Sequence, residues 1–266
     1  MEDSPLSQPP TDAVPSPTDA VPWTFQQTLS GAALTLVPWL LVIFVLNNLG
    51  GKQSLSTPLS ARVDLTTAII NLILSAAIEA VFLIAPLYIA NHPFQNLKSR
   101  GKLALQALGF RKINIWQALG WAIMLMVAIY GVNILYQYLI AAFHLNIQTN
   151  DQVLLQQSKY APLSVYASLL VATFVAPICE EVFFRGFLFM GLARGMPVGW
   201  AIVISSLLFA IAHGDPGSFI VLCVIGLALA FLRWRTQSLW PGILLHTLNN
   251  GLGALLIVLN MWGVIH

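Results

Sequence analysis

Long apolar runs, interrupted by a few ionisable residues, dominate this chain beyond residue 28. The runs lie near 31–49, 65–91, 115–143, 164–193, 197–213, 218–234 and 239–264. They approach or exceed the roughly 20 residues that a membrane-spanning helix needs, although the fifth and sixth are short. The runs are too long and too continuously apolar for strands. The pattern therefore predicts an all-α fold, a polytopic transmembrane bundle of about seven spanning helices.

Composition supports the same class. The chain has 266 residues, of which 58% are hydrophobic and 8% are charged, whereas soluble proteins carry about 25% charged residues. Such a chain cannot cover its surface with polar groups in water, so we expect an integral, multi-pass protein with the lipid bilayer as a partner. The net charge of +2 gives no case for nucleic acid.

Residues 1–28 form a separate piece that is rich in Pro, Ser, Thr and Asp. The sequence of residues 10–15 recurs at 17–22. So short a proline-rich repeat cannot bury a core, and we expect a disordered tail, followed by a transmembrane domain over 29–266. The tail lacks the basic and apolar regions of a secretory signal.

The basic residues predict the orientation in the membrane. The stretch 92–113 has no acid, and we place it in the cytoplasm. Its basic residues are Lys98, Arg100, Lys102, Arg111 and Lys112. If the segments alternate, Arg194, Arg233 and Arg235 fall on the same side, Asp151 and Asp215 fall on the other, and the N-terminus is inside.

The first chemical motif is Glu180-Glu181-Val-Phe-Phe-Arg185, inside the fourth run. Ionisable side chains at bilayer depth cost roughly 2.5–3.5 kcal/mol each on insertion scales, so they are rare and usually functional. On a helix, Glu181 and Arg185 share a face, while Glu180 is turned by about 100°. One carboxylate can thus pair with the arginine while the other faces a cavity as a base toward water. A structural ion pair is the alternative.

Two more motifs follow on later segments. Phe209 precedes His213 by four residues at the end of the fifth run, and His246 precedes Asn250 by four residues in the seventh. His246 and Asn250 share a helix face and can both donate to an oxyanion. An interfacial histidine and polar contacts between helices are the alternative interpretations. Cys179 is interpreted as a small packing residue.

The distances of the motif residues from the turns that join their segments give an independent test of whether these residues can meet. Glu180 lies 14 residues before Arg194, and His213 lies 16 residues after Pro197. Both are therefore roughly 20–25 Å from the turn that joins their segments, so they can face each other. The seventh segment must tilt or start deeper for His246 and Asn250 to join them.

The ordered motifs EExxxR, FxxxH and HxxxN on successive apolar segments resemble the CPBP family of CAAX proteases and bacteriocin-processing (Abi) proteins, which are intramembrane endopeptidases. The resemblance covers about 164–255 and implies a four-helix catalytic core. It implies that Glu180 activates water with His213 as its partner. It also implies that His246 and Asn250 bind the oxyanion, that Arg185 and Glu181 support the site, and that Phe209 packs beside it as a possible substrate-binding residue.

The resemblance also frames the open alternatives. We expect no cofactor, because there is no HExxH motif; zinc held by Glu180, His213 and His246 is the alternative. We expect a peptide or protein substrate at the membrane, in a bacterial-type plasma membrane or an organelle of that ancestry. The depth of Glu180 and His213 places them nearer the side opposite the basic loop, whereas CAAX processing in eukaryotic members faces the cytosol.

Two non-proteolytic functions compete with the peptidase. An inactive scaffold or chaperone of the same fold would use the motif residues to hold helices together. A solute or proton carrier would use Glu79 with Glu180 and Glu181 as a relay, although no inverted repeat supports it.

Overall fold

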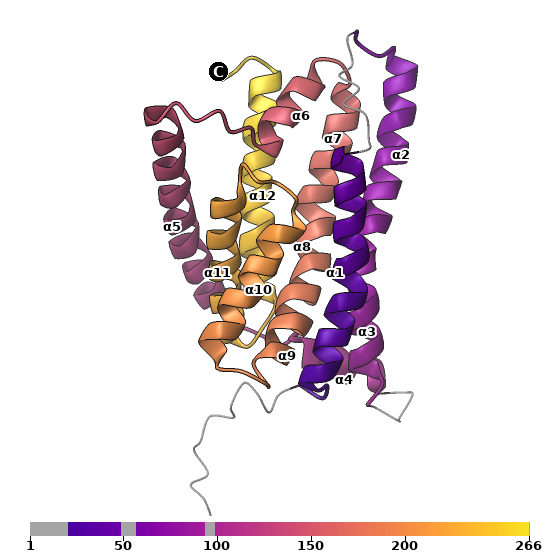
Figure 1. The fold of residues 1–266 in the computed structure, drawn as a ribbon, viewed down its shortest axis with the longest axis vertical. Coiled ribbons are helices and arrows are strands. Elements are labelled where there is room, and N and C mark those ends of the chain that lie inside the picture. The colour runs from indigo at the N-terminus through magenta and orange to yellow at the C-terminus, as the bar shows by residue number, and fades with distance from the viewer. Residues whose placement is uncertain (1–20, 49–56, 94–98, 266) are drawn as a thin grey trace, which may run out of the picture.

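The computed structural model describes residues 21–48, 57–93 and 99–265, and every regular element in these ranges is helical (Figure 1). In chain order the elements are α1 (Phe25–Asn48), α2 (Ala61–Ala80), η2 (Val81–Leu83), α3 (Ile84–Asn91), α4 (Arg100–Leu108), α5 (Ile115–Ala142), α6 (Asn150–Ser158), α7 (Pro162–Leu170), η3 (Val171–Val175), α8 (Ala176–Glu181), η4 (Val182–Phe189), α9 (Met190–Leu192), α10 (Val198–Ala212), α11 (Phe219–Thr236) and α12 (Trp240–Met261). The predicted all-α polytopic fold is confirmed.

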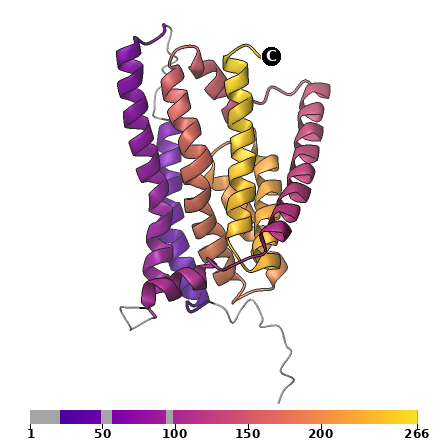
Figure 2. The same ribbon diagram turned by 180° about the vertical axis from the view of Figure 1, so that it is seen from behind.

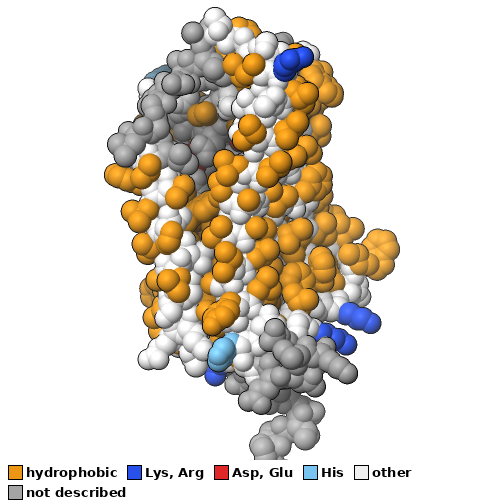
Figure 3. Space-filling view, turned by 90° about the vertical axis from the view of Figure 1, so that its right-hand side faces the viewer, with side chains coloured by type: hydrophobic (Ala, Val, Ile, Leu, Met, Phe, Trp, Pro, Cys, Tyr) orange, Lys and Arg blue, Asp and Glu red, His pale blue; other side chains and the backbone are white. Residues whose placement is uncertain are grey.

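Within the described residues, 6 helical stretches are long and apolar enough to cross a membrane. They are Phe25–Val45, Ala61–Asn91, Ile115–Ala142, Pro162–Leu192, Phe219–Thr236 and Trp240–Met261. The helix Val198–Ala212 is apolar but shorter, with 15 residues. Figure 3 shows a side of the bundle on which hydrophobic side chains cover most of the height, and Lys and Arg appear only near the two ends. The chain is an integral, multi-pass membrane protein.

Helix α1 begins at Phe25, before the start at residue 31 that the apolar pattern predicts. A reciprocal capping box explains the earlier start: the Gln27 amide donates to Thr24 Oγ1, and the Thr24 amide donates to Gln27 Oε1. Trp23 is fully buried just before it. Residues 1–20 of the predicted disordered tail lie outside the described residues.

Most of the described basic residues gather at one end of the bundle. There the amide of Leu239 donates to the Gly109 carbonyl, and Ser238 Oγ donates to the Arg111 carbonyl, so the α4–α5 and α11–α12 connections lie together. The α9–α10 turn, which carries Arg194, lies at the same lower end in Figure 1, and α6 and the end of α12 lie at the other. The alternation of sides expected from the sequence agrees with this arrangement.

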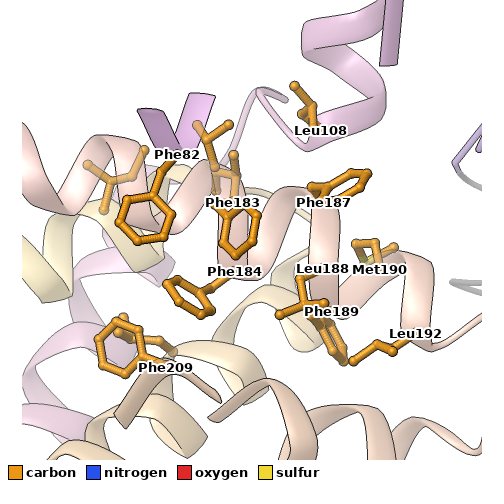
Figure 4. Packing of buried hydrophobic residues seen from close by; sticks show 14 of the residues in the cluster. Phe82, Leu108, Phe183, Phe184, Phe187, Leu188, Phe189, Met190, Leu192 and Phe209 are labelled. Carbon is orange, nitrogen blue, oxygen red and sulfur yellow. The ribbon is translucent and has the colours of Figure 1, made fainter. Parts of the chain in front are cut away.

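A cluster of buried aromatic rings fills the centre of the bundle between α8, η4, η2 and α10 (Figure 4). Phe183 packs edge-on against Phe184 at 4.9 Å between centroids, and Phe184 packs edge-on against Phe209 at 5.3 Å. Phe82 contacts both Phe183 and Phe184 from the second span. These rings fix the face that η4 presents to α10, which sets the direction of the polar residues beside them.

Helices α10 and α11 form a tight hairpin. A Cβ atom at Gly226 would lie 2.9 Å from Ser206 Cβ, so glycine permits the two backbones to approach closely. Helix α12 then starts deeper in the bundle than the lower end of the α7–α9 helix, as Figure 2 shows. This deeper start meets the requirement that the sequence set for His246 to reach the depth of Glu180.

Candidate active site

Glu180 and Glu181 lie on a single long helix, Pro162–Leu192, that is not a regular α-helix. They stand in α8, between the π-helical stretches η3 and η4. Pro177 lacks an amide hydrogen, so a regular helix could not keep its hydrogen bonds there, and η3 precedes it. Inserted π turns are frequent at functional sites because they redirect side chains.

Asp64 of α2 fixes the start of this helix. Its carboxylate accepts hydrogen bonds from the backbone amides of Leu163 and Ser164 at 2.9 and 3.1 Å, and from Ser164 Oγ at 2.8 Å. A buried carboxylate at a helix N-terminus satisfies amides that have no partner inside the helix. Asp64 is thus a positioning residue that the sequence analysis missed, although an acid directly before the second apolar run was a visible signal.

Glu181 is the centre of a buried ionic network. Arg185 Nη1 lies 3.0 Å from Glu181 Oε1, and both side chains are 0% exposed. His246 Nδ1 lies 3.2 Å from the same oxygen. The Arg185 Nη1 hydrogens are not directed for a hydrogen bond, so we describe the pair as an ion pair. The network joins the motif on α8 and η4 to the motif on α12.

Arg185 makes two further contacts. Its Nη2 donates to the Gly226 carbonyl at 3.3 Å, and its guanidinium carbon lies 4.1 Å from the centroid of the Phe209 ring. Cation–π attraction is strongest when the partners are desolvated, as they are here. Arg185 therefore links η4 to α10 and α11 as well as neutralising Glu181.

Glu180 points to two imidazoles. Its Oε2 lies 3.7 Å from His213 Nε2 and 3.8 Å from His246 Nε2. Both distances exceed a direct hydrogen bond, and no described group donates one to this buried oxygen. Glu180 Oε2 is thus a hydrogen-bond acceptor without a donor among the described residues, and it lies between two ring nitrogens. At these separations a water molecule can bridge the carboxylate and an imidazole.

In both histidines the ring nitrogen that points away from Glu180, Nδ1, contacts a hydrogen-bond acceptor, which orients the ring. His213 Nδ1 lies 2.8 Å from the Phe209 carbonyl, which can only accept, so this nitrogen carries the proton. His246 Nδ1 likewise donates to the Glu181 carboxylate. In the neutral imidazoles each Nε2 is therefore the acceptor that faces Glu180, and each becomes a donor when its ring is protonated.

Phe209 and Asn250 complete the predicted set. The Phe209 ring is fully buried and lies 4.4 Å from the His213 ring and 5.7 Å from the His246 ring. Asn250 Nδ2 donates to the Ala172 carbonyl in η3 at 2.9 Å, which leaves its second amide hydrogen free. Glu180, Glu181, Arg185, His213 and His246 thus meet through their ionic contacts, with Phe209 packed beneath them, whereas Asn250 lies beside them and is held by the π turn.

Gly242 is a second residue that the sequence analysis missed. A Cβ atom at this position in the first turn of α12 would lie 2.9 Å from Glu181 Oε2. Only glycine lets the helix approach the carboxylate this closely, and the N-terminal end of a helix favours negative charge. A glycine in a predicted first turn was the available signal, but its partner was not readable from the sequence.

A cavity of about 400 Å³ connects the site to the surface. His213, His246 and Asn250 line it together with residues of α5, α6 and α11. The described residues contain no group of three His, Cys, Asp or Glu side chains arranged to hold a metal ion.

The segment that holds the candidate site is similar to a known protein family. Residues 162–252 match the family model of the Rce1-like proteins, described as type II CAAX prenyl endopeptidases. This segment is similar to the Rce1-like family. It contains all three motifs, so the resemblance that they indicate is confirmed over this part of the chain.

Two curated relatives extend the Rce1-like comparison. The chain is 33% identical over 101 residues to a Bacillus subtilis protein named "Putative membrane peptidase YdiL", which covers 38% of this chain and 40% of that protein. It is 28% identical over 207 residues to an uncharacterized protein of Mycoplasma capricolum, which covers 73% of this chain and 57% of that protein. The matches thus span less than two thirds of either relative. No solved structure matches the chain.

Proposed function

We propose that this protein is an intramembrane endopeptidase of the CAAX-protease type that hydrolyses a peptide bond with water activated by Glu180 and His213. The observation that supports it is the free Glu180 Oε2 between two imidazole nitrogens, 3.7 and 3.8 Å away, beside a cavity that reaches the surface. The name of the YdiL relative and the Rce1-like match over the same residues favour the same activity.

In the proposed reaction, water attacks the substrate carbonyl carbon and gives a proton to Glu180 or to His213 Nε2. The oxyanion that forms accepts hydrogen bonds from His246 Nε2 and from the free amide hydrogen of Asn250. Because His246 Nδ1 already donates to Glu181, His246 Nε2 acts as this donor in the imidazolium form. The C–N bond then breaks, and the leaving amine takes up the proton that water released.

The test is the isosteric substitution Glu180→Gln, assayed on a peptide library with the purified full chain in lipid nanodiscs. Loss of the general base should lower kcat by about 10²–10⁴. His246→Ala should cost about 10²–10³ if it removes an oxyanion donor. Cys179→Ala, next to Glu180, is the matched control and should keep activity. Wild-type cleavage by the Glu180 variant would remove this mechanism.

Metal dependence is tested separately with the same assay. The proposed reaction needs no cofactor, so a chelator should leave cleavage unchanged. Chelator-sensitive cleavage that zinc restores would instead favour the alternative in which Glu180, His213 and His246 ligate the metal.

A catalytically inactive scaffold remains the second candidate, because the buried network of Glu181, Arg185 and His246 would stabilise a bundle whether or not catalysis occurs. Stability distinguishes the two. A scaffold predicts that Glu180→Gln weakens folding as much as Glu181→Gln does, whereas the peptidase predicts a folded, inactive Glu180 variant. The bacterial source of both curated relatives supports a bacterial-type plasma membrane as the location.

A further inference from the structure

The cavity beside the site has two distinct ends. Its inner end is formed by Phe209, His213 and His246. Its outer end is formed by residues of α5 and α6, including the exposed Asn150 and Asp151. His246 is 2% exposed, and its Nε2 makes no hydrogen bond to the described residues, so a polar group is available at the inner end of this passage.

The outer end lies on the side of the bundle away from the basic loops. Helix α6 lies with the end of α12 at the upper end of Figure 1, opposite α4 and the α9–α10 turn. Two contacts join the α10–α11 turn to this end: the Asn150 amide donates to Asp215 Oδ2, and Tyr136 Oη donates to the Gly217 carbonyl. Since basic loops mark the cytoplasmic side, the passage opens toward the opposite compartment.

The passage has a negative charge balance. Among its lining residues are two acids, Asp151 and Asp215, and no Lys or Arg. Asp215 is buried, and its carboxylate accepts three backbone hydrogen bonds, from Asn150, Gly217 and Ser218. These hydrogen bonds satisfy the Asp215 carboxylate within the fold and hold the α10–α11 turn against α6.

Asp151 differs from Asp215. Its side chain is exposed at the outer end, and none of the described residues forms a hydrogen bond or ion pair with its carboxylate. Protein around the opening still displaces part of its water. This burial, and then the nearby charge of Asp215, raise the pKa of Asp151 above its ordinary value of 3.8. A cation placed beside it would relieve both effects. The other titratable groups that line the cavity are Tyr130, Tyr136, His213, Asp215 and His246.

We propose that Asp151 is a specificity residue that binds a positively charged side chain of a substrate entering from the face opposite the basic loops. This inference rests on the proposed peptidase function and adds the substrate class: an extracytoplasmic peptide segment with Lys or Arg near the scissile bond.

The first test measures charge preference with the full chain in nanodiscs. Matched peptides carry Lys, Gln or Glu at each position flanking the cleaved bond. An ion pair with an exposed carboxylate is worth roughly two- to fivefold, so the wild type should prefer Lys over Gln by about that factor, mainly through KM. Asp151→Asn should abolish the preference, and Asp151→Lys should reverse it toward Glu. Lys159→Gln, exposed on the same segment but outside the cavity lining, is the control and should change nothing.

The second test measures sidedness without activity. Asp151→Cys in a Cys179→Ala/Cys223→Ser background should react with a membrane-impermeant maleimide from outside intact cells, and Lys112→Cys should react only in everted vesicles. Cleavage that depends on Glu180 but ignores substrate charge or Asp151 overturns the inference, and so does labelling of position 151 from the cytoplasmic side. Loss of Glu180 dependence would instead refute the proposed function, so the two failures are distinguishable.

Discussion

Replacing Arg185 with methionine should strongly destabilise the bundle, because it leaves the Glu181 carboxylate buried without its cation. The two groups are 3.0 Å apart and fully buried. At an effective dielectric constant of about 20, their attraction is roughly 5.5 kcal/mol. Removing one partner of a buried pair typically costs about 3–5 kcal/mol, which agrees in size. His246 remains beside Glu181 and offsets part of the loss, so we expect a free energy of unfolding lower by about 3–4 kcal/mol.

A double-mutant cycle separates the pair from its surroundings. The double variant Glu181→Leu/Arg185→Met replaces both charges with apolar groups of similar volume, which is often neutral in buried sites. It should therefore be no less stable than either single variant, although inactive. Stability is measured by reversible denaturant unfolding in mixed micelles, followed by tryptophan fluorescence. Glu180→Gln is the control and should change stability little, since no described group hydrogen-bonds to Glu180 Oε2. Additive single and double effects, or an Arg185→Met variant as stable as the wild type, would refute the reasoning.

Three further predictions follow from the positioning residues and from the cavity. Gly242→Ala should lower kcat at least about tenfold, because the new methyl group lies 2.9 Å from Glu181 Oε2. Gly199→Ala in α10 meets nothing within 4 Å and lies outside the cavity lining, so it should be silent, and equal effects would contradict this. Asp64→Ala should lower unfolding free energy by about 1–2 kcal/mol through loss of the cap on α7, and Asp64→Asn by less, as denaturant unfolding would reveal. The Lys-over-Gln preference assigned to Asp151 needs the ionised carboxylate, so it should be full at neutral pH and should fall as the pH drops through a pKa above 3.8. The measurement is the ratio of kcat/KM for the Lys peptide to that for the Gln peptide, because the titration of the catalytic groups cancels in this ratio. A ratio that does not change with pH would count against the assignment.

The sequence predicted the parts of this molecule that depend on spacing. Apolar run length gave six spans among the described residues, whereas the fifth run forms only the shorter helix Val198–Ala212. Equal separation of Glu180 and His213 from their shared turn gave the convergence that the ionic contacts display. The early start of α1 was also readable, since Thr24 and Gln27 stand at capping-box spacing. These features follow from local geometry, so a single sequence contains them.

The sequence could not predict features that depend on how distant elements meet. The π turns beside Pro177 follow from how one helix satisfies its backbone while packing on its neighbours. The role of Gly242 depends on a carboxylate 61 residues earlier in the chain, and the role of Asp64 on an amide about 100 residues later. Treating α8 as part of a regular helix correctly separated Glu181, which pairs with Arg185, from Glu180, which points elsewhere. It gave no reason for Asn250 to donate a hydrogen bond to the Ala172 carbonyl.

The α10–α11 hairpin has a consequence for how the chain is threaded through the bilayer. It leaves the basic end and returns to it, and Figure 1 shows its turn below the tips of α7 and α12. One arm leads away from the basic end and the other leads back, so the hairpin does not change the side on which the chain continues. The start of α1 and the end of α12 therefore lie on opposite sides of the membrane, whether or not the hairpin is counted as two crossings. The Asp215 carboxylate at the tip of this hairpin has all three of its amide donors only when the turn has closed and α6 lies against it, so the tip is satisfied by protein groups at a depth where the chain turns back.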